Sequence, residues 1–195
     1  MFGWPLIRKR SDRDRYCEGV TAFPVRLYGD PVLKVATQEV TDIDGKIASL
    51  VDTMIETMYE ANGVGLAANQ IGVSKSVFVY DIGDGPITIV NPKIVESDGE
   101  WTFEEGCLSV PGLSWEITRP NAIHLVGLDL DGNEISIETD EYEGRVFQHE
   151  LDHLNGVVLL ERLDDDQRAE AKKILRKRAE AQSVRESGGL RGLFS

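Results

Sequence analysis

Two histidines in the pattern H-E-x-x-H are the feature of this sequence with the clearest chemical meaning. His149 and His153 are two of only three histidines in the chain. Residues four apart share one face of a helix, so both imidazoles can bind one metal ion. Glu150 would lie beside that ion, where its carboxylate can take a proton from a metal-bound water. The competing interpretation is a pair of hydrogen-bonded histidines on an ordinary helix, which the scarcity of histidine disfavours.

A catalytic metal ion of this kind needs a third protein ligand and an open coordination position. No histidine follows His153, but Glu161 and Glu170 lie downstream and stay candidates. Cys107 offers a thiolate upstream, inside E-E-G-C-L-S-V-P, and Gly106 beside it allows close approach of another backbone. A single cysteine is more often an inert core residue. The residues alone therefore leave the third ligand open.

A glycine-rich segment, G-V-G-L-A-A-N-Q at residues 63–70, matches the loose dinucleotide-binding pattern G-x-G-x-x-A. That pattern requires a strand before it and a helix after it. Here the predicted order is reversed, with a helix before and a β-rich run after, which argues against a nucleotide site. The small residues instead suit the edge of a strand along which an extended peptide can lie.

The elements that must position these residues follow from hydrophobic periodicity and capping signals. His149 and His153 lie on a predicted helix that ends at Asn155-Gly156, whereas His124 lies in a predicted strand without partners and is interpreted as structural. Strands in the middle of the chain and helices on either side predict an α+β fold. We expect helices at about residues 42–61, 142–154 and 165–181, and strands at about 76–82, 87–90, 122–130 and 134–139. Asp42 or Asp44 would cap the first helix, and its methionines are interpreted as core residues.

Composition narrows the class of protein. The chain has 195 residues and a formal net charge of −13, which makes it a poor DNA-binding protein. Residues 167–195 depart from this balance, with eight basic and three acidic side chains. No apolar run approaches the roughly 20 residues of a membrane-spanning helix. The N-terminus does not resemble a secretory signal, and Cys17 and Cys107 suggest no disulfide framework, so we expect a cytoplasmic protein.

Together, three motifs resemble those of the peptide deformylase family. G-V-G-L-A-A-N-Q, E-G-C-L-S and Q-H-E-L-D-H occur in the family's order and separations, and the resemblance covers about residues 25–178. It implies mixed and antiparallel strands around a central metal-binding helix. It also implies a catalytic domain at residues 23–182, between a flexible extension, 1–22, and a flexible tail, 183–195. The departures are this extension and residues 114–116, which we place in a loop after Pro111.

The resemblance also implies the chemistry. Cys107, His149 and His153 would bind one divalent metal ion, iron(II) in the family, which zinc, nickel or cobalt can replace. Glu150 would act as general base and then as general acid. The side-chain amide of Gln70 and the backbone N–H of Leu108 would stabilise negative charge on the formyl oxygen. The reaction would remove the formyl group from the N-terminal methionine of a newly made protein and release formate.

Substrate contacts and partners are expected as follows. Apolar residues would enclose the methionine side chain, although each of them could equally be plain core, and two glycines would hold the peptide backbone as an added strand. The basic C-terminal helix could contact ribosomal RNA, or simply face water. We expect a monomer. The alternatives are a gluzincin-type zinc endopeptidase and a non-catalytic metal-bound module. The candidate substrate-binding residues are Val64, Phe103, Tyr142 and Val146 for the side chain, and Gly65 and Gly106 for the backbone.

Overall fold

The computed structural model describes residues 21–191, without the side chains of residues 181–191. Cys17 and most of the expected N-terminal extension lie outside the described residues. The chain divides into two compact units between Val158 and Leu159. The first unit contains η1 (Pro31–Lys34), α2 (Gly45–Glu60), β1 (Gly65–Ala67), η2 (Ala68–Ile71), β2 (Val77–Tyr80), β3 (Ile87–Asp98), β4 (Trp101–Gly106), β5 (Ser114–Arg119), β6 (Ala122–Leu128), β7 (Glu134–Thr139) and α3 (Glu141–Leu154). The fold is α+β, as predicted.

Helix α2 begins where the sequence predicts a capping aspartate. The carboxylate of Asp44 accepts hydrogen bonds from the backbone N–H groups of Lys46 and Ile47, which have no partner inside the helix. One face of the helix is apolar and buried, with spacings of three and four residues between its members. That face consists of Ile47, Val51, Met54, Ile55 and Met58. The methionines are core residues, as predicted.

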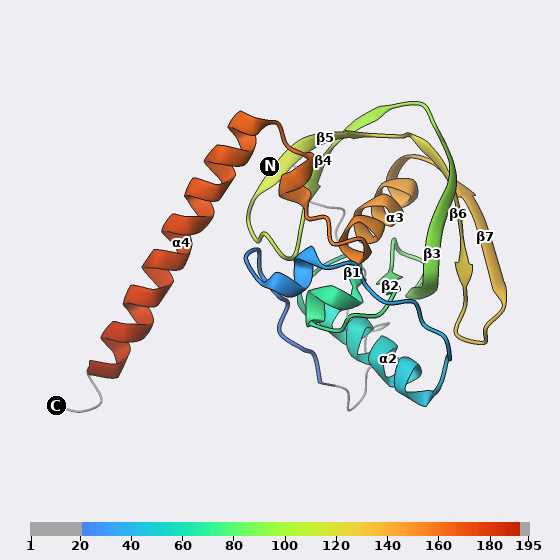
Figure 1. Ribbon diagram of the computed structural model, residues 1–195, viewed down its shortest axis with the longest axis horizontal. Coiled ribbons are helices and arrows are strands. Elements are labelled where there is room, and N and C mark those ends of the chain that lie inside the picture. Colours follow the sequence, from blue (N-terminus) through green and yellow to red (C-terminus); the bar gives the residue numbers. More distant parts are fainter. Residues whose placement is uncertain (1–20, 192–195) are drawn as a thin grey trace. The chain divides into compact units, whose positions relative to one another are not determined.

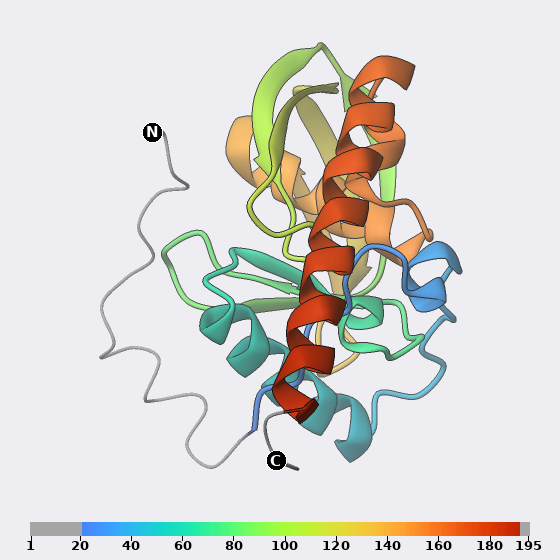
Figure 2. The same ribbon diagram turned by 90° about the vertical axis from the view of Figure 1, so that its left-hand side faces the viewer.

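Five strands form an antiparallel sheet in the order β1-β2-β3-β6-β7. All four residues of β2 are buried. Since successive side chains of a strand point to opposite sides, both faces of β2 are covered. Val77 and Val79 pack in the same core cluster as α2. Phe78 and Tyr80 pack with α3 residues such as Phe147. The sheet therefore lies between the two helices, as the two ribbon views also show (Figure 1 and Figure 2).

A second, two-stranded sheet was not predicted from the sequence. It is the hairpin of β4 and β5, in which Phe103 pairs with Ile117 and Glu105 with Trp115. Residues 114–116, which we expected in a loop, begin strand β5, so that prediction is wrong. The hairpin directs Phe103 and Glu105 to the same side because they are two residues apart.

Strand β3 continues eight residues beyond the predicted end at Val90. Pro92 would normally end a strand, but a shift in register between Val90 and Lys93 accommodates it. Asn91 adopts a positive φ of 51° there, and its side chain bonds the backbone of Val40. The local bulge lets one long strand pair with both β2 and β6.

The second unit consists of η3 (Leu159–Arg162) and α4 (Asp165–Arg191). The expected helix end at about Ala181 falls short of Arg191 by ten residues. No proline or glycine occurs between Ala181 and Gly188 to stop the helix.

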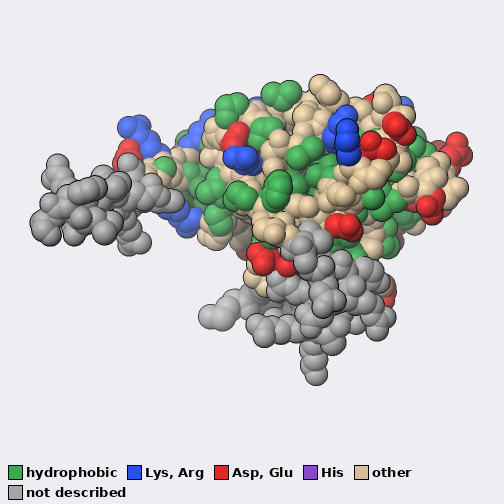
Figure 3. Space-filling view, turned by 90° about the horizontal axis from the view of Figure 1, so that it is seen from below, with side chains coloured by type: hydrophobic (Ala, Val, Ile, Leu, Met, Phe, Trp, Pro, Cys, Tyr) green, Lys and Arg blue, Asp and Glu red, His purple; other side chains and the backbone are tan. Residues whose placement is uncertain are grey.

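None of the described helices combines the length and hydropathy that crossing a bilayer requires. Hydrophobic side chains on the face shown in Figure 3 lie among charged ones.

Candidate active site

Helix α3 carries two of the predicted metal ligands on one face. The rings of His149 and His153 lie 5.1 Å apart between centroids, one turn from each other. Asn155 caps the helix, and Gly156 follows with a positive φ of 74°. Because a Cβ at Gly156 would lie 2.9 Å from the backbone of Lys34, glycine is required there by both conformation and space. The helix end that the sequence predicts thus fixes the position of His153.

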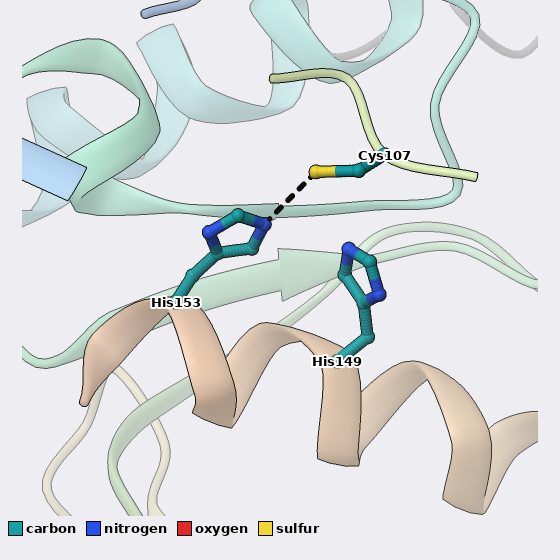
Figure 4. Close-up of side chains that lie close together, drawn as sticks. All are labelled: Cys107, His149 and His153. Atoms are coloured by element: carbon teal, nitrogen blue, oxygen red, sulfur yellow. Dashed lines mark hydrogen bonds between the residues drawn. The ribbon is translucent and has the colours of Figure 1, made fainter. Parts of the chain in front are cut away.

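The hairpin brings Cys107 to these histidines. Cys107 directly follows β4, and its Sγ lies 3.2 Å from His153 Nε2 (Figure 4). The three ligand atoms all lie within 4.8 Å of one another, the only such cluster of His, Cys, Asp and Glu among residues 21–180. Desolvation alone would raise the pKa of the Cys107 thiol, but the two imidazoles hold that pKa well below its usual value. A thiolate and two imidazoles fit a divalent transition metal.

Glu105, which the sequence did not single out, orients one of the ligands. Its Oε2 lies 3.0 Å from Nδ1 of His149, a contact that leaves Nε2 of the same ring available to a metal. The side chain is only 2% exposed. Burial alone would raise the pKa of Glu105, but hydrogen bonds from His149 and Arg119 hold it well below the usual range. Glu105 is therefore a buried carboxylate anion.

Two arginines neutralise this anion. Arg119 donates from Nε to Glu105 at 2.7 Å, and Arg145 donates from a terminal nitrogen to Glu105 at 2.9 Å. Arg119 also donates to Asp152 of α3 at 2.6 Å. The network connects the β4–β5 hairpin, which carries Cys107, to the helix that carries the histidines. It therefore fixes the separation of the ligands.

The residues at 68–71 support the site from the opposite side. Asn69 donates from Nδ2 to the backbone oxygen of His153. The side-chain oxygen of Gln70 accepts from Ala67 N at 2.8 Å, so its Nε2 is directed towards the E-G-C-L-S segment. There Nε2 lies 3.2 Å from Ser109 Oγ and 4.0 Å from Cys107 Sγ. The amide group of Gln70 is thus held next to the ligands.

Glu150 is buried beside the same ligands. It is 4% exposed, and its Oε2 has no hydrogen-bond partner among the described residues. Burial raises the pKa of Glu150 to about 7, against the opposing effect of His149 and His153. A carboxyl group with a pKa near neutrality can both accept and release a proton at physiological pH. Its environment is suited to a general base that later acts as a general acid.

Gly65 gives Glu150 the space that it occupies. A Cβ at Gly65 would lie 2.4 Å from Glu150 Oε1 and 2.9 Å from its Cδ. We therefore expect Gly65→Ala to displace the carboxylate and to lower kcat by about 10²-fold, since misplacement by about 1 Å has such an effect. The measurement is kcat for a formyl-methionine peptide, the substrate that the resemblance implies.

Gly144→Ala is the matched control for this change. Gly144 lies on α3, and a Cβ there would make ordinary contacts of 3.5 Å or more. We expect parental kcat in that variant, since alanine also favours the helix. If Gly65→Ala and Gly144→Ala retain the same kcat, the close approach of Gly65 to Glu150 has no catalytic importance.

A cleft of about 560 Å³ opens onto these residues. Its lining includes every predicted site residue except His153, which is 1% exposed. Phe103 and Tyr142 meet edge to face at 5.9 Å on its wall. The lining members among the predicted residues are Val64, Gly65, Gln70, Phe103, Gly106, Cys107, Leu108, Tyr142, Val146, His149 and Glu150.

His124 does not belong to this cleft. It lies on β6, with its Nε2 2.8 Å from Ser136 Oγ, so it has the partner that the sequence did not reveal. It lines a separate open groove of about 500 Å³ together with acidic residues such as Glu96 and Glu138. That groove contains none of the predicted ligands.

Comparisons with known proteins agree with this arrangement. Residues 22–169 match the family model for polypeptide deformylase. A peptide deformylase of Agathobacter rectalis is 51% identical over 140 residues, which cover 72% of this chain and 89% of the relative. The crystal structure of a peptide deformylase from Legionella pneumophila has a TM-score of 0.79 and 37% identity, and the match covers 84% of this chain and 98% of that one.

A second solved structure also matches this chain, with a higher sequence identity. The peptide deformylase from Thermotoga maritima has 43% identity and a TM-score of 0.72, with 74% of this chain and 99% of that chain covered. None of these comparisons supports the gluzincin alternative. From the three motifs, the converging thiol and imidazoles, and these matches, we conclude that the chain belongs to the peptide deformylase family.

Proposed function

We propose that Cys107, His149, His153 and Glu150 carry out the reaction of this family, which removes the formyl group from the N-terminal methionine of newly made proteins. The observation that carries the proposal is the convergence of one thiol and two imidazoles within 4.8 Å, next to a buried carboxyl group. The end of strand β4 and helix α3 carry these groups, and all of them except the imidazole of His153 line an open cleft. The reaction needs these groups, and the cleft admits the end of a polypeptide.

Iron(II) is the metal that we propose for the site, with zinc, nickel or cobalt as replacements. One thiolate and two imidazoles suit all of these ions. When bound, the ion would lower the pKa of a coordinated water towards 7 and polarise the formyl oxygen. Glu105 supports the proposal, because its contact with Nδ1 of His149 fixes the ring in the orientation that binding through Nε2 requires.

The chain's own groups supply proton transfer and charge stabilisation. Glu150 accepts a proton from the attacking water and then donates it to the departing amine of methionine. Gln70 Nε2 and the backbone N–H of Leu108 donate to the formyl oxygen as it gains negative charge. A Cβ at Gly63 would lie 2.7 Å from the side chain of Leu108, so this glycine leaves the space in which Leu108 lies.

The peptide backbone would enter as an additional strand. Among residues 21–191, strand β1 is an edge of the five-stranded sheet and β4 pairs only with β5, so each has one edge without a strand partner. Gly65 of β1 and Gly106 of β4 both line the cleft. Backbone hydrogen bonds to such edges hold an extended peptide without selecting its sequence. The apolar wall at Val64, Phe103 and Val146 would then enclose the methionine side chain.

The decisive experiment compares two substrates and measures the metal. Protein purified without air should hydrolyse formyl-Met-Ala and release formate. It should leave acetyl-Met-Ala intact, because the formyl carbon carries only hydrogen and a close wall beside the ligands would exclude the acetyl methyl group. Metal analysis of the same sample should find about one equivalent of iron. Hydrolysis that survives in Cys107→Ala would contradict the proposed ligand set.

The basic helix α4 is proposed to dock on ribosomal RNA, which would place the enzyme beside its substrate. Lys172, Lys173 and Lys177 are exposed, in a chain with a net charge of −13. The hydrophobic residues Ala171, Ile174 and Leu175 are more buried than these lysines, so one side of the helix remains charged. On an otherwise acidic protein, phosphate groups are attracted mainly to the surface that carries a cluster of basic side chains.

Changing Lys172, Lys173 and Lys177 to glutamate should abolish co-sedimentation with ribosomes at low salt and leave hydrolysis of short formyl-methionine peptides unchanged. Binding through phosphate contacts also weakens steeply as salt rises in the parent. The control variant changes Lys46, Lys75 and Lys93 to glutamate, which alters the net charge equally outside α4. Unchanged sedimentation of the α4 variant would leave the helix without a role in docking.

The remaining features of the protein are proposed from this function. The substrate is a nascent chain, so we propose that the enzyme works in the cytoplasm, as a monomer. Residues 23–182 would form the catalytic domain. Of the two ends that we expected to be flexible, residues 1–20 and 192–195 lie outside the described residues, and residues 183–191 continue helix α4.

A further inference from the structure

A turn directly after β4 places a buried serine hydroxyl beside the site. The backbone N–H of Val110 donates to the backbone oxygen of Cys107 at 2.9 Å. Leu108 and Ser109 are therefore the two central residues of a β-turn. The bond that closes the turn does not use the N–H of Leu108, which the proposed function assigns to the formyl oxygen. Ser109 is only 1% exposed, so its hydroxyl must find its partner inside the protein.

That partner is the side-chain amide of Gln70, and one short segment of the chain holds the backbones of both residues. The backbone N–H of Arg26 donates to the oxygen of Gln70 at 2.7 Å, and that of Tyr28 donates to the oxygen of Ser109 at 2.8 Å. The two donors are two positions apart in the chain, so the bonds fix the separation of Gln70 and Ser109. Neither bond involves the serine side chain, and a change to alanine would keep both.

The contacts of the Gln70 amide determine where each of its hydrogens is directed. Oε1 accepts from the backbone N–H of Ala67 at 2.8 Å, which identifies the other end of the amide as the donor. Nε2 donates one hydrogen to Ser109 Oγ at 3.2 Å. Nε2 also faces Cys107 Sγ, but at 4.0 Å this contact is long, and sulfur is a weak acceptor. The second hydrogen is therefore directed towards the ligands and remains available to a substrate.

We propose that Ser109 is a positioning residue for the reaction: its hydroxyl accepts one N–H of Gln70 and thereby directs the other to the formyl oxygen. This rests on the proposed function, in which Gln70 stabilises negative charge on that oxygen. Such a donor is most effective when it is held in place before the charge develops. Without the hydroxyl, the amide keeps only the bond from Ala67 and can rotate about it, so its second N–H is directed less accurately.

The test is a double-mutant cycle on kcat for formyl-Met-Ala-Ser, with Ser109→Ala, Gln70→Ala and both changes together. We expect Ser109→Ala to lower kcat about fivefold to tenfold, as the loss of one neutral hydrogen bond would produce. KM should stay at the parental value, because the contact with the oxygen forms in the transition state. Gln70→Ala should lower kcat about 10²- to 10³-fold, and adding Ser109→Ala should lower it no further. An equal effect of Ser109→Ala with and without Gln70 would overturn the proposal.

Thr57→Val is the matched control for the loss of a buried hydroxyl group. Thr57 is also 1% exposed, but it lies on α2 and does not line the cleft. This variant should keep parental kcat even though it loses the hydrogen bonds of the hydroxyl. If kcat fell equally in Thr57→Val and Ser109→Ala, the effect would come from a general loosening of the fold and not from the orientation of Gln70.

A spectroscopic measurement separates this proposal from the proposed function. In zinc-loaded protein without peptide, the two side-chain N–H signals of Gln70 are identified by NMR through their loss in Gln70→Ala. The bond to Ser109 Oγ should shift one of them downfield, and this shift should disappear in Ser109→Ala. Failure of the parent to hydrolyse formyl-Met-Ala-Ser would contradict the proposed function. Parental kcat or an unchanged Gln70 signal in Ser109→Ala would overturn the positioning role while the proposed function stands.

Discussion

Glu150→Gln should lower kcat for a formyl-methionine peptide by about 10²- to 10⁴-fold while the metal content stays at the parental value, because the general base is lost and the ligands are not. Glutamine has nearly the same shape as glutamate, so it fits the space beside Gly65 that a larger change would disturb. The measurements are kcat at saturating peptide and metal equivalents per chain after gel filtration.

Glu134→Gln controls for the removal of one carboxylate from an acidic protein. Glu134 is exposed on β7 and has no part in the cleft. That variant should keep parental kcat. If Glu150→Gln turned over within a few-fold of the parent, another group would be the base. If it lost metal as well as turnover, Glu150 would be needed for the site to assemble rather than for proton transfer.

The parts of the site that came from the sequence are those in which one local pattern decides the geometry. His149, Glu150 and His153 needed only a helix, and Asn155-Gly156 marked its end correctly. Asp44 likewise marked the start of α2. In each case the relevant contacts lie within about one helical turn, so neither the sheet order nor the hairpin had to be known.

The β4–β5 hairpin was missed because its inward positions are not all apolar. On β4, Glu105 lies on the same face as Phe103, and on β5, Arg119 lies on the same face as Ile117. Alternation of apolar and polar residues, the usual sign of a half-buried strand, is therefore interrupted in both strands. The two charges compensate each other at 2.7 Å, and only the paired structure reveals this.

The same reasoning explains why Glu105, Arg119 and Arg145 were not predicted as site residues. Each is an ordinary charged residue in the sequence, far from its partners along the chain. Charged side chains are rarely buried unless they are paired, and pairing over such separations has no local pattern. The signal that was available is the position of Glu105 two residues before Cys107, which would place it on the strand that leads to the thiolate.

Glu105→Gln should destabilise the fold by about 3 to 5 kcal/mol, because it removes the carboxylate that two buried guanidinium groups share and leaves Arg119 with Asp152 alone. Arg119 and Arg145 are 4% and 3% exposed, so water cannot replace the lost carboxylate. The measurement is the free energy of unfolding in urea with a chelator present, so that loss of metal does not contribute. Glu104→Gln, at the neighbouring exposed position, should change stability by less than about 1 kcal/mol.

The affinity for metal is a second property to measure in Glu105→Gln. Oε2 of Glu105 lies 3.0 Å from Nδ1 of His149. The loss of such a partner typically weakens metal binding by about 10- to 100-fold. A competition titration with a zinc chelator measures this directly on folded protein. Parental stability and affinity in Glu105→Gln would mean that the arginines find other acceptors and that His149 needs no orienting carboxylate. Loss of stability with parental affinity would restrict Glu105 to joining the hairpin and the helix, and the orientation of His149 would then depend on packing alone.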